Sequence, residues 1–475
     1  MPNRIRLALP AGDLRAPISE LLTSCGLRVE GYGDGSRSYR LKAAGREEID
    51  ARVFREKDIP IQVAIGNYDL GICSLAWVKQ MEVRFTRQPV VQLCNLGVQP
   101  SFLFVAAAIG HCERLEDLAN LGVVRIASEY ANIAEAFARA ARLPRYRVQP
   151  VWGAVEAYPP EDADCIIIAA QSEGALRGAG VEPLFKLLEN AAWLIGNASA
   201  LAEKDLSAVS GPLMSGATHG GMHNGLSLAG PLPRPTSDHS RKRSGSLRMA
   251  VPDGHLQRHV VDALREAGLD CEGYGDGELL RRPVSPIDGL EVKVIRPHDM
   301  PALVATGEMD LAITGRDCLM EHRYAFPTSP VAEVMDLGRG QYNLSAVVSE
   351  DLPVSTISEA MEHWRGQGRP LIRVASEFPT TADHYARARH FWRYQVMPIS
   401  GASEGFVPED ADLLIEGTET GKTLAENRLK PIDLLYRSTT CVIARHDRHL
   451  TGERSKVFGR VIGALKRVTG AVRTV

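Results

Sequence analysis

A short segment in the C-terminal part of the chain, residues 412–424 (DLLIEGTETGKTL), contains the residue types best suited to binding a phosphate. An apolar strand ends in Glu416, and a turn rich in Thr and Gly then leads into a helical stretch. Free backbone N–H groups at the start of a helix suit a phosphate monoester, and a glycine lets the backbone approach it closely. The acid before the turn can accept hydrogen bonds from the vicinal hydroxyls of a sugar. The candidate binding residues are Glu416, Thr418, Glu419, Thr420, Gly421, Lys422, Thr423 and Leu424.

A plain helix with an N-terminal cap would give much of the same pattern, so the segment alone is only moderately specific. The elements around it favour an α/β protein. Apolar strands expected at 5–10 and 247–252 are each followed by a Gly turn and an amphipathic stretch that ends at Gly26 or Gly268. Further short apolar strands alternate with helical segments. We therefore predict open, mainly parallel sheets, with the loop at the end of a strand.

The chain contains two diverged copies of one unit. The sequence GYGDG occurs at 31–35 and again at 273–277, an offset of 273 − 31 = 242 residues. The motif R-x-x-D-[IM]-P starts at Arg55 and at Arg296, and PEDAD occurs at 160–164 and 408–412. Because these and other matching segments keep one order, we infer a tandem duplication.

These repeats divide the chain into a first unit at 1–206, a linker at 207–246 and a second unit at 247–475. The linker is rich in Ser, Gly and Pro, which predicts a flexible tether spanning roughly 35 Å. That length allows the two units to dock as an intramolecular pseudo-dimer. Two linker histidines, His219 and His223, have no Cys or carboxylate nearby, so we expect a solvated linker and no metal site.

Composition limits the classes of partner. The chain has 55 Lys and Arg against 58 Asp and Glu, so no global basic field indicates nucleic acid. No segment has the length of a signal peptide core or a membrane span. Eight scattered cysteines without a Cys-x-x-Cys pair predict reduced thiols in a cytoplasmic protein. The basic amphipathic stretch at 454–468 is expected to pack against the second unit and not on a membrane.

The second unit resembles ATP phosphoribosyltransferase, the enzyme family that opens histidine biosynthesis. The resemblance covers essentially all of 247–450, through the ordered segments RMAVPDGHL, VIRPHDMPALVATGEMDLAITGRDCLME, VMDLGRG, RVASEFP, GASEGFVPEDADLLIEGTETGKTLAENRLKPI and YRSTTCVIA. It implies units of two α/β lobes of the periplasmic-binding-protein kind, with the site in the cleft between them. It also implies that the TG-x-TL loop holds the 5′-phosphate of phosphoribosyl pyrophosphate and that Glu416 holds the ribose hydroxyls. The implied reaction gives N1-(5-phosphoribosyl)-ATP and pyrophosphate, with Mg²⁺ on the pyrophosphate.

The first unit resembles the same family more weakly. It has Ile168 in place of Glu416, and Ser172 to Ala175 in place of the TGKT turn. A carboxylate at Glu173 would repel an incoming phosphate. The second copy's Thr314, Gly315 and Asp317 have no counterparts in the first. We therefore predict that only the second unit has a working phosphoribosyl site.

Arg55 and Arg296 are kept in both copies and are the candidate catalytic arginines. Each could pair with the Asp three residues later, Asp58 or Asp299, on a surface loop. The alternative is a contact to the triphosphate or the departing pyrophosphate. In the family an arginine of this motif reaches across the dimer, which would let Arg55 complete the site of the second unit.

The remaining candidates for the nucleotide or the cleft are Gly254, Asp310, Thr314, Gly315, Asp317, Glu404 and Asp412. A structural role near strand ends is equally open for Glu404 and Asp412. The family shows Lys-Gly-Arg-Leu at the first turn where this chain has Asp253-Gly254-His255-Leu256, which removes two positive charges. We expect no protein nucleophile and no protein metal cage.

Three functions remain open at this point. The first is an ATP phosphoribosyltransferase built as a covalent pseudo-dimer; the second is a non-catalytic regulatory or sensor protein that binds a metabolite in the same cleft. The third is another phosphoribosyl transfer. The chain resembles the shorter form of the family, with only about 25 residues after the last matching strand. That form implies a separate regulatory subunit related to histidyl-tRNA synthetase, and further homo-oligomerisation is also open.

Overall fold

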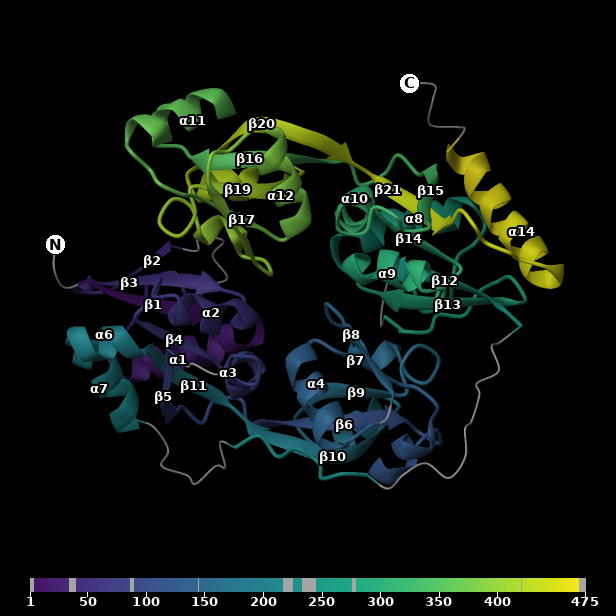
Figure 1. Cartoon of the computed structure of the whole chain (residues 1–475), viewed down its shortest axis with the longest axis horizontal. Coiled ribbons are helices and arrows are strands. Elements are labelled where there is room, and N and C mark those ends of the chain that lie inside the picture. The colour runs from purple at the N-terminus through teal and green to yellow at the C-terminus, as the bar shows by residue number, and fades with distance from the viewer. Residues whose placement is uncertain are drawn as a thin grey trace.

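The structure is a computed structural model that describes residues 4–33, 40–85, 89–143, 145–216, 225–232, 245–275, 279–419 and 421–469. Thr420, His219 and His223, three residues singled out in the sequence, lie outside the described residues. The described parts form four sheets, two in each copy (Figure 1).

Each unit consists of two α/β lobes. The first lobe of the first unit has the strand order β2-β3-β1-β4-β11-β5. Its strands are β1 (Ile5–Pro10), β2 (Arg40–Ala43), β3 (Arg46–Phe54), β4 (Leu70–Ser74), β5 (Val90–Asn95) and β11 (Ala192–Asn197). Its helices are α1 (Arg15–Ser24), α2 (Ile59–Ala64), α3 (Leu75–Glu82), α6 (Ala198–Glu203) and α7 (Ser207–Gly216).

The second lobe of the first unit has the order β10-β6-β9-β7-β8. Its strands are β6 (Ser101–Ala108), β7 (Val124–Ser128), β8 (Tyr146–Pro150), β9 (Cys165–Ala170) and β10 (Val181–Asn190). Its helices are α4 (Ala131–Ala140) and α5 (Glu173–Gly178).

The second unit repeats this plan. Its first lobe has the order β13-β12-β14-β21-β15 and its second lobe β18-β17-β19-β16-β20. The first lobe contains β12 (Leu247–Pro252), β13 (Leu290–Ile295), β14 (Leu311–Gly315), β15 (Val331–Asp336), β21 (Thr440–Arg445), α8 (Gln257–Glu266), α9 (Met300–Ala305), α10 (Arg316–Ala325) and α14 (Gly452–Thr469). The second lobe contains β16 (Tyr342–Ser349), β17 (Ile372–Ser376), β18 (Tyr394–Pro398), β19 (Leu413–Thr418), β20 (Leu429–Ser438), α11 (Ile357–Gly366), α12 (Pro379–Ala388) and α13 (Lys422–Glu426).

The sheets are mixed where the sequence predicted mainly parallel ones. In the second unit β12 pairs in parallel with β13 and β14, whereas β21 runs antiparallel to both β14 and β15. The reason is the path of the chain, because it crosses into the second lobe and returns through β20 and β21. The returning strand enters the first sheet from the opposite direction. The cleft therefore lies between two lobes that are joined by two crossings.

The two units dock reciprocally. Figure 1 shows the first lobe of each unit beside the second lobe of the other. Arg6 binds Asp410 at 2.6 Å across one contact, and Arg248 binds Asp162 across the other. Asp162 and Asp410 occupy the same position in the two PEDAD motifs, so the same acid anchors both contacts. Apolar packing accompanies these ion pairs, as where the rings of Phe54 and Phe406 meet edge to face at 4.8 Å.

The predicted linker is partly ordered. Its first ten residues form α7, whose Val209 and Leu213 are fully buried in the core of the first unit. Within residues 225–232, the Ser227 N–H donates to the Leu187 carbonyl at 2.7 Å. The high content of Gly, Ser and Pro did not indicate a helix here. Two apolar side chains four residues apart are nevertheless enough to dock one helical face on the core. The predicted flexible tether is therefore shorter than the range 207–246.

The C-terminal helix α14 packs as expected against the second unit, where Val457, Val461 and Leu465 join the core of its first lobe. No helix among the described residues is both long and apolar enough to cross a membrane. The eight cysteines are all unpaired thiols.

Candidate functional site

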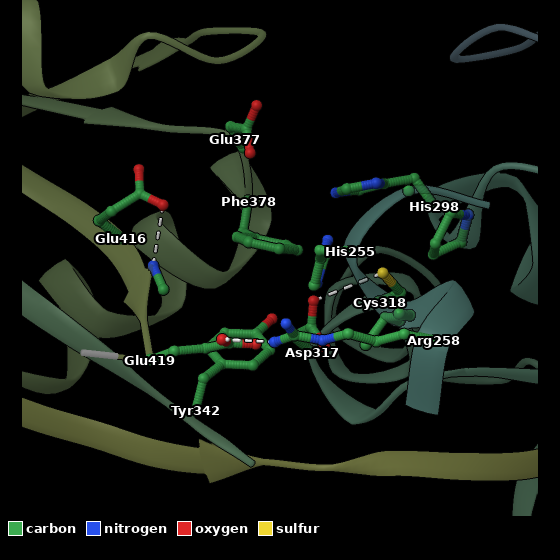
Figure 2. A pocket seen from close by; sticks show the side chains of 14 residues that line it. His255, Arg258, His298, Asp317, Cys318, Tyr342, Glu377, Phe378, Glu416 and Glu419 are labelled. Atoms are coloured by element: carbon green, nitrogen blue, oxygen red, sulfur yellow. Dashed lines mark hydrogen bonds and ion pairs between the residues drawn. The ribbon is translucent and has the colours of Figure 1, made fainter. Parts of the chain in front are cut away.

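A cavity of about 470 Å³ lies between the two lobes of the second unit (Figure 2). The first lobe contributes residues from the turn after β12, from the R-x-x-D motif and from α10. The second lobe contributes the start of β16, the end of β17 and the segment that leaves β19. The cavity is lined by Gly254, His255, Leu256, Arg258, Pro297, His298, Asp317, Cys318, Tyr342, Glu377, Phe378, Glu416, Gly417 and Glu419. Four predicted site residues, Gly254, Asp317, Glu416 and Glu419, are thus brought together from distant segments.

Glu416 belongs to a group of buried acids. Its carboxylate accepts hydrogen bonds from the Ser403 hydroxyl and from the Gly417 N–H, the latter at 3.0 Å. Burial, followed by repulsion from Glu377 and Glu404, raises the pKa of Glu416 to about 8. Burial also raises the pKa of Glu404, which was predicted as a cleft acid and lies beside Ser403. A pKa of about 8 favours the protonated form of the Glu416 carboxyl at neutral pH.

The segment after Glu416 has the geometry of an open anion loop. Gly421 has φ +70°, a left-handed conformation that favours glycine, and it starts α13. No described side chain caps the N–H groups of α13. In the first unit the Ser172 hydroxyl caps α5 by accepting the Ala175 N–H at 3.2 Å, and Glu173 is the first residue of that helix. The two helices therefore begin differently, with Gly421 at the N-cap of α13 and Ser172 at the N-cap of α5.

The other loop residues surround this turn. Thr418 ends β19 opposite Asn343, and Leu424 is the buried residue of α13. The Lys422 side chain is 69% exposed, with Glu426 as a neighbour at 3.9 Å. Thr423 follows Lys422 in the first turn of α13. The buried Leu424 side chain therefore anchors the loop, and Lys422 remains at the surface.

Asp317 is held at the back of the cavity. It is buried and accepts a hydrogen bond from the Ser438 hydroxyl at 2.7 Å, at the crossing between the lobes. A Cβ built on Gly315 would lie 2.1 Å from an Asp317 oxygen, so only glycine fits there. Thr314 is fully buried and donates to the Pro297 carbonyl at 2.9 Å. Thr314 and Gly315 thus position Asp317 and the R-x-x-D segment.

Arg55 of the first unit extends to the second unit. A Cβ built on Gly401 would lie 3.0 Å from Arg55 Nε and 3.2 Å from Glu377 Oε1, and Glu377 lines the cavity. The positive charge of Arg55 opposes the effect of burial on the Glu377 pKa, which is still raised. Asp58 does not pair with Arg55 but accepts the Ser400 N–H of the second unit at 2.9 Å. The surface ion pair considered for Arg55 is therefore not present.

Arg296 makes the mirror-image contact. Its Nε would lie 3.0 Å from a Cβ on Gly153 of the first unit, and its guanidinium binds Asp253 at 3.2 Å. Arg296 therefore lies towards the second lobe of the first unit, whereas the sequence suggested a role in its own cleft. The cause is the reciprocal docking, in which each arginine contacts the second lobe of the other unit.

Two predicted cleft acids lie elsewhere. Asp310 precedes β14 and accepts the Arg248 N–H at 2.9 Å, with Arg454 as a second partner. Asp412 precedes β19 and accepts the Arg373 N–H at 2.9 Å. Both acids lie just before the beginning of a strand, and neither lines the cavity. They organise arginines and do not face the cavity.

The sequence reasoning missed an aromatic stack at the cavity. The His298 ring stacks on Trp152 of the first unit at 4.3 Å and on Phe378 of the second lobe at 5.2 Å. Figure 2 shows the imidazole extending towards the space between Glu377, Phe378 and His255. Burial lowers the pKa of His298 to about 4, so the ring is neutral. The only available signal was that Lys57 in the first copy becomes His298 in the second.

No built metal site accompanies the cavity. The described residues contain no group of three or more His, Cys, Asp or Glu side chains that could hold a metal ion. Mg²⁺ commonly binds through one or two carboxylates together with substrate phosphates, so a metal at this cavity would take most of its ligands from the substrate and from water.

The geometry first defines a class of protein: each unit is a two-lobed α/β fold, and the cavity of the second unit lies between its lobes. A family model described as HisG, ATP phosphoribosyltransferase, matches residues 55–213 and 296–465, which is more than half of the chain. The chain belongs to the ATP phosphoribosyltransferase family, with two tandem copies. The predictions of this family, of the fold class and of an enzyme of this kind are confirmed.

Individual relatives have the same name. The ATP phosphoribosyltransferase of Picosynechococcus sp. is 29% identical over 200 residues, covering 42% of this chain and 89% of the relative. That of Rubrobacter xylanophilus is 32% identical over 200 residues, covering 42% and 86%. Among solved structures, the ATP phosphoribosyl transferase (HisG:HisZ) complex from Thermotoga maritima is 22% identical, with a TM-score of 0.38 over 47% of this chain and 99% of that chain.

Proposed function

We propose that the second unit transfers the phosphoribosyl group of phosphoribosyl pyrophosphate to N1 of ATP. In this reaction N1 forms a bond to C1 of the ribose while the bond from C1 to the pyrophosphate oxygen breaks. Pyrophosphate leaves with the electron pair, and the product is N1-(5-phosphoribosyl)-ATP. The observation that carries the proposal is the meeting of Glu416 and Glu419 with the turn at Gly254 and with Asp317 around one cavity.

The loop would bind the 5′-phosphate and Glu416 the ribose hydroxyls. The start of α13 offers backbone N–H groups with no described side-chain cap, and Gly421 lets a ligand approach the backbone. Glu416 would accept the hydroxyl hydrogens best once it has lost its proton. Positive charge develops on the sugar in the transition state, and the acids Glu377 and Glu404 near Glu416 would stabilise that charge.

The first unit would act as a helper by placing Arg55 beside Glu377, a residue that lines the cavity. The guanidinium lies against Gly401 and near Glu377, where it could neutralise the departing pyrophosphate. Mg²⁺ would enter bound to the pyrophosphate of the substrate. A separate regulatory subunit related to histidyl-tRNA synthetase, further homo-oligomerisation and a cytoplasmic location remain predictions.

The experiment measures pyrophosphate release from the full chain with ATP, phosphoribosyl pyrophosphate and Mg²⁺. We expect release that needs both substrates and is lost in Glu416→Ala. The matched control is Ile168→Ala, the same position in the first unit, which should retain activity. If Ile168→Ala abolished release and Glu416→Ala did not, the active unit would be the first. Ligand binding without release would favour the sensor function.

A further inference from the structure

An ion pair spans the cavity at its edge. Arg258, from the first turn of α8 in the first lobe, binds Glu419, from the loop in the second lobe, at 3.0 Å. Figure 2 shows the two side chains meeting end to end beside Tyr342. His259 lies 3.9 Å from the other Glu419 oxygen. One contact therefore joins the phosphate loop directly to the opposite lobe.

The charge balance of the cavity makes Arg258 unusual. The described lining residues include four acids, Asp317, Glu377, Glu416 and Glu419, and one arginine or lysine, which is Arg258. The neighbouring His259 adds little charge, because burial and Arg258 itself lower its pKa. A polyphosphate needs positive charge in the cleft. In the structure Arg258 forms its ion pair with Glu419.

The first copy lacks this pair. At equivalent positions it has Ala16 for Arg258 and Pro17 for His259, by the offset 256 − 14 = 242 at the preceding Leu. It has Gln171 for Glu419, by the offset 416 − 168 = 248. The pair is therefore found only in the copy that keeps the TGKT loop.

We propose that Arg258 binds a phosphate group of the polyphosphate substrate and that Glu419 holds Arg258 in position until the substrate displaces it. This inference rests on the proposed function of the same cleft. Arg258 is 67% and Glu419 37% exposed, and ion pairs this exposed are weak. A phosphate carries more charge than a carboxylate and binds guanidinium in the same two-pronged way, so it wins the exchange.

The test is a calorimetric titration of the full chain with inorganic pyrophosphate at fixed ionic strength. We expect Arg258→Gln to weaken binding about tenfold, with partial recovery in Arg258→Lys. Glu419→Gln should tighten binding about threefold by releasing the arginine. In the double variant the gain from Glu419→Gln should disappear, because Arg258 is no longer there to be released. The control is Arg265→Gln, an exposed arginine on the same helix paired with Asp262, which should bind like the unchanged chain.

Two results would overturn the inference. One is unchanged pyrophosphate binding in Arg258→Gln. The other is an equal gain from Glu419→Gln with and without Arg258, which would show only general repulsion. Failure of the unchanged chain to release pyrophosphate from both substrates would instead remove the proposed reaction, while the titration would still decide the role of Arg258.

Discussion

The two units differ most clearly at the helix that follows the last parallel strand of the second lobe. In the second unit this helix, α13, starts at Gly421 with no described side-chain cap, and Glu416 precedes it. In the first unit Ser172 caps the helix, Glu173 occupies its first position and Ile168 replaces the acid. The first unit thus lacks both the acid and the glycine on which the proposed phosphoribosyl site of the second unit depends.

The docking contacts show the opposite behaviour. Asp58 accepts a backbone N–H from the second unit, and Asp299 accepts the Trp152 N–H from the first at 3.0 Å. Burial raises the pKa of both Asp58 and Asp299 to about 7. Binding chemistry has diverged between the copies while docking chemistry has stayed symmetric. This difference supports the proposal that the first unit acts through the residues it contributes across the contact.

The largest expected effect on activity comes from replacing Gly421 of the second unit with glutamate, the residue at the equivalent position 173 of the first unit. Gly421→Glu should lower kcat/KM about a thousandfold, because two like charges 4 Å apart repel by about 4 kcal/mol at an effective dielectric constant of 20. Steady-state pyrophosphate release measures the loss.

Two controls separate charge from backbone strain in that experiment. Gly421→Ala should lose far less, since it meets only the cost of φ +70° and its Cβ enters open space. Gly174→Glu, in the first unit, should leave the rate unchanged. Equal losses in Gly421→Ala and Gly421→Glu would contradict a phosphate at the loop.

The two arginines provide the next test. Arg55→Ala should lower kcat about a hundredfold, because a charge-assisted contact to the leaving group is lost. Arg296→Ala should change kcat less than about threefold, because that arginine lies over Gly153 of the first unit. Single-turnover rates would measure both. A larger effect from Arg296→Ala would reverse the assignment of working and helper units.

Glu416 makes stability depend on pH in a defined direction. In the folded chain the pKa of Glu416 is about 8, above its ordinary value of 4.5. The contribution of Glu416 to the free energy of unfolding is therefore fully present below pH 4.5 and is lost as the pH rises through 8. Glu416→Gln removes this loss, and we expect its unfolding midpoint to exceed that of the unchanged chain by about 2–4 °C at pH 8.5. The difference should shrink towards pH 5 in a calorimetric scan. A difference independent of pH would argue against a protonated Glu416.

The smallest expected effect concerns the aromatic stack. Trp152→Ser introduces the residue found at the equivalent Ser400 and removes one face of the contact with His298. We expect about a fivefold rise in the KM for ATP, since an aromatic pair contributes about 1 kcal/mol. Trp152→Phe should restore most of the loss. An unchanged KM in Trp152→Ser would confine the stack to a packing role.

The sequence was most informative where chemistry is local. The loop, its acid and its degeneration in the first copy could be read from residue types, because they follow one strand within a few positions. The offset between the repeats also identified the two units. By contrast, Asp310 and Asp412 could not be separated from cleft acids, because an acid beside an apolar strand looks the same at either strand end.

Contacts between the units were the hardest to predict. His298 and Trp152 are 146 positions apart, and no pattern in either segment predicts that the two rings are in contact. The exchange of Arg55 and Arg296 follows from the docking geometry, which a repeat pattern does not specify. The helix α7 was missed because its apolar residues are few in a segment rich in Gly, Ser and Pro.

The reciprocal docking has a consequence for how the copies could diverge. Two separate chains, one intact and one degenerate, would also form pairs of like chains, and pairs of degenerate chains would be inert. Covalent linkage raises the local concentration of one copy around the other to the millimolar range. Within one chain, each intact copy can always meet a degenerate one at a fixed stoichiometry of one to one. Mutations in the first cleft are then no longer exposed to selection for ligand binding, provided that the surface carrying Arg55 is kept.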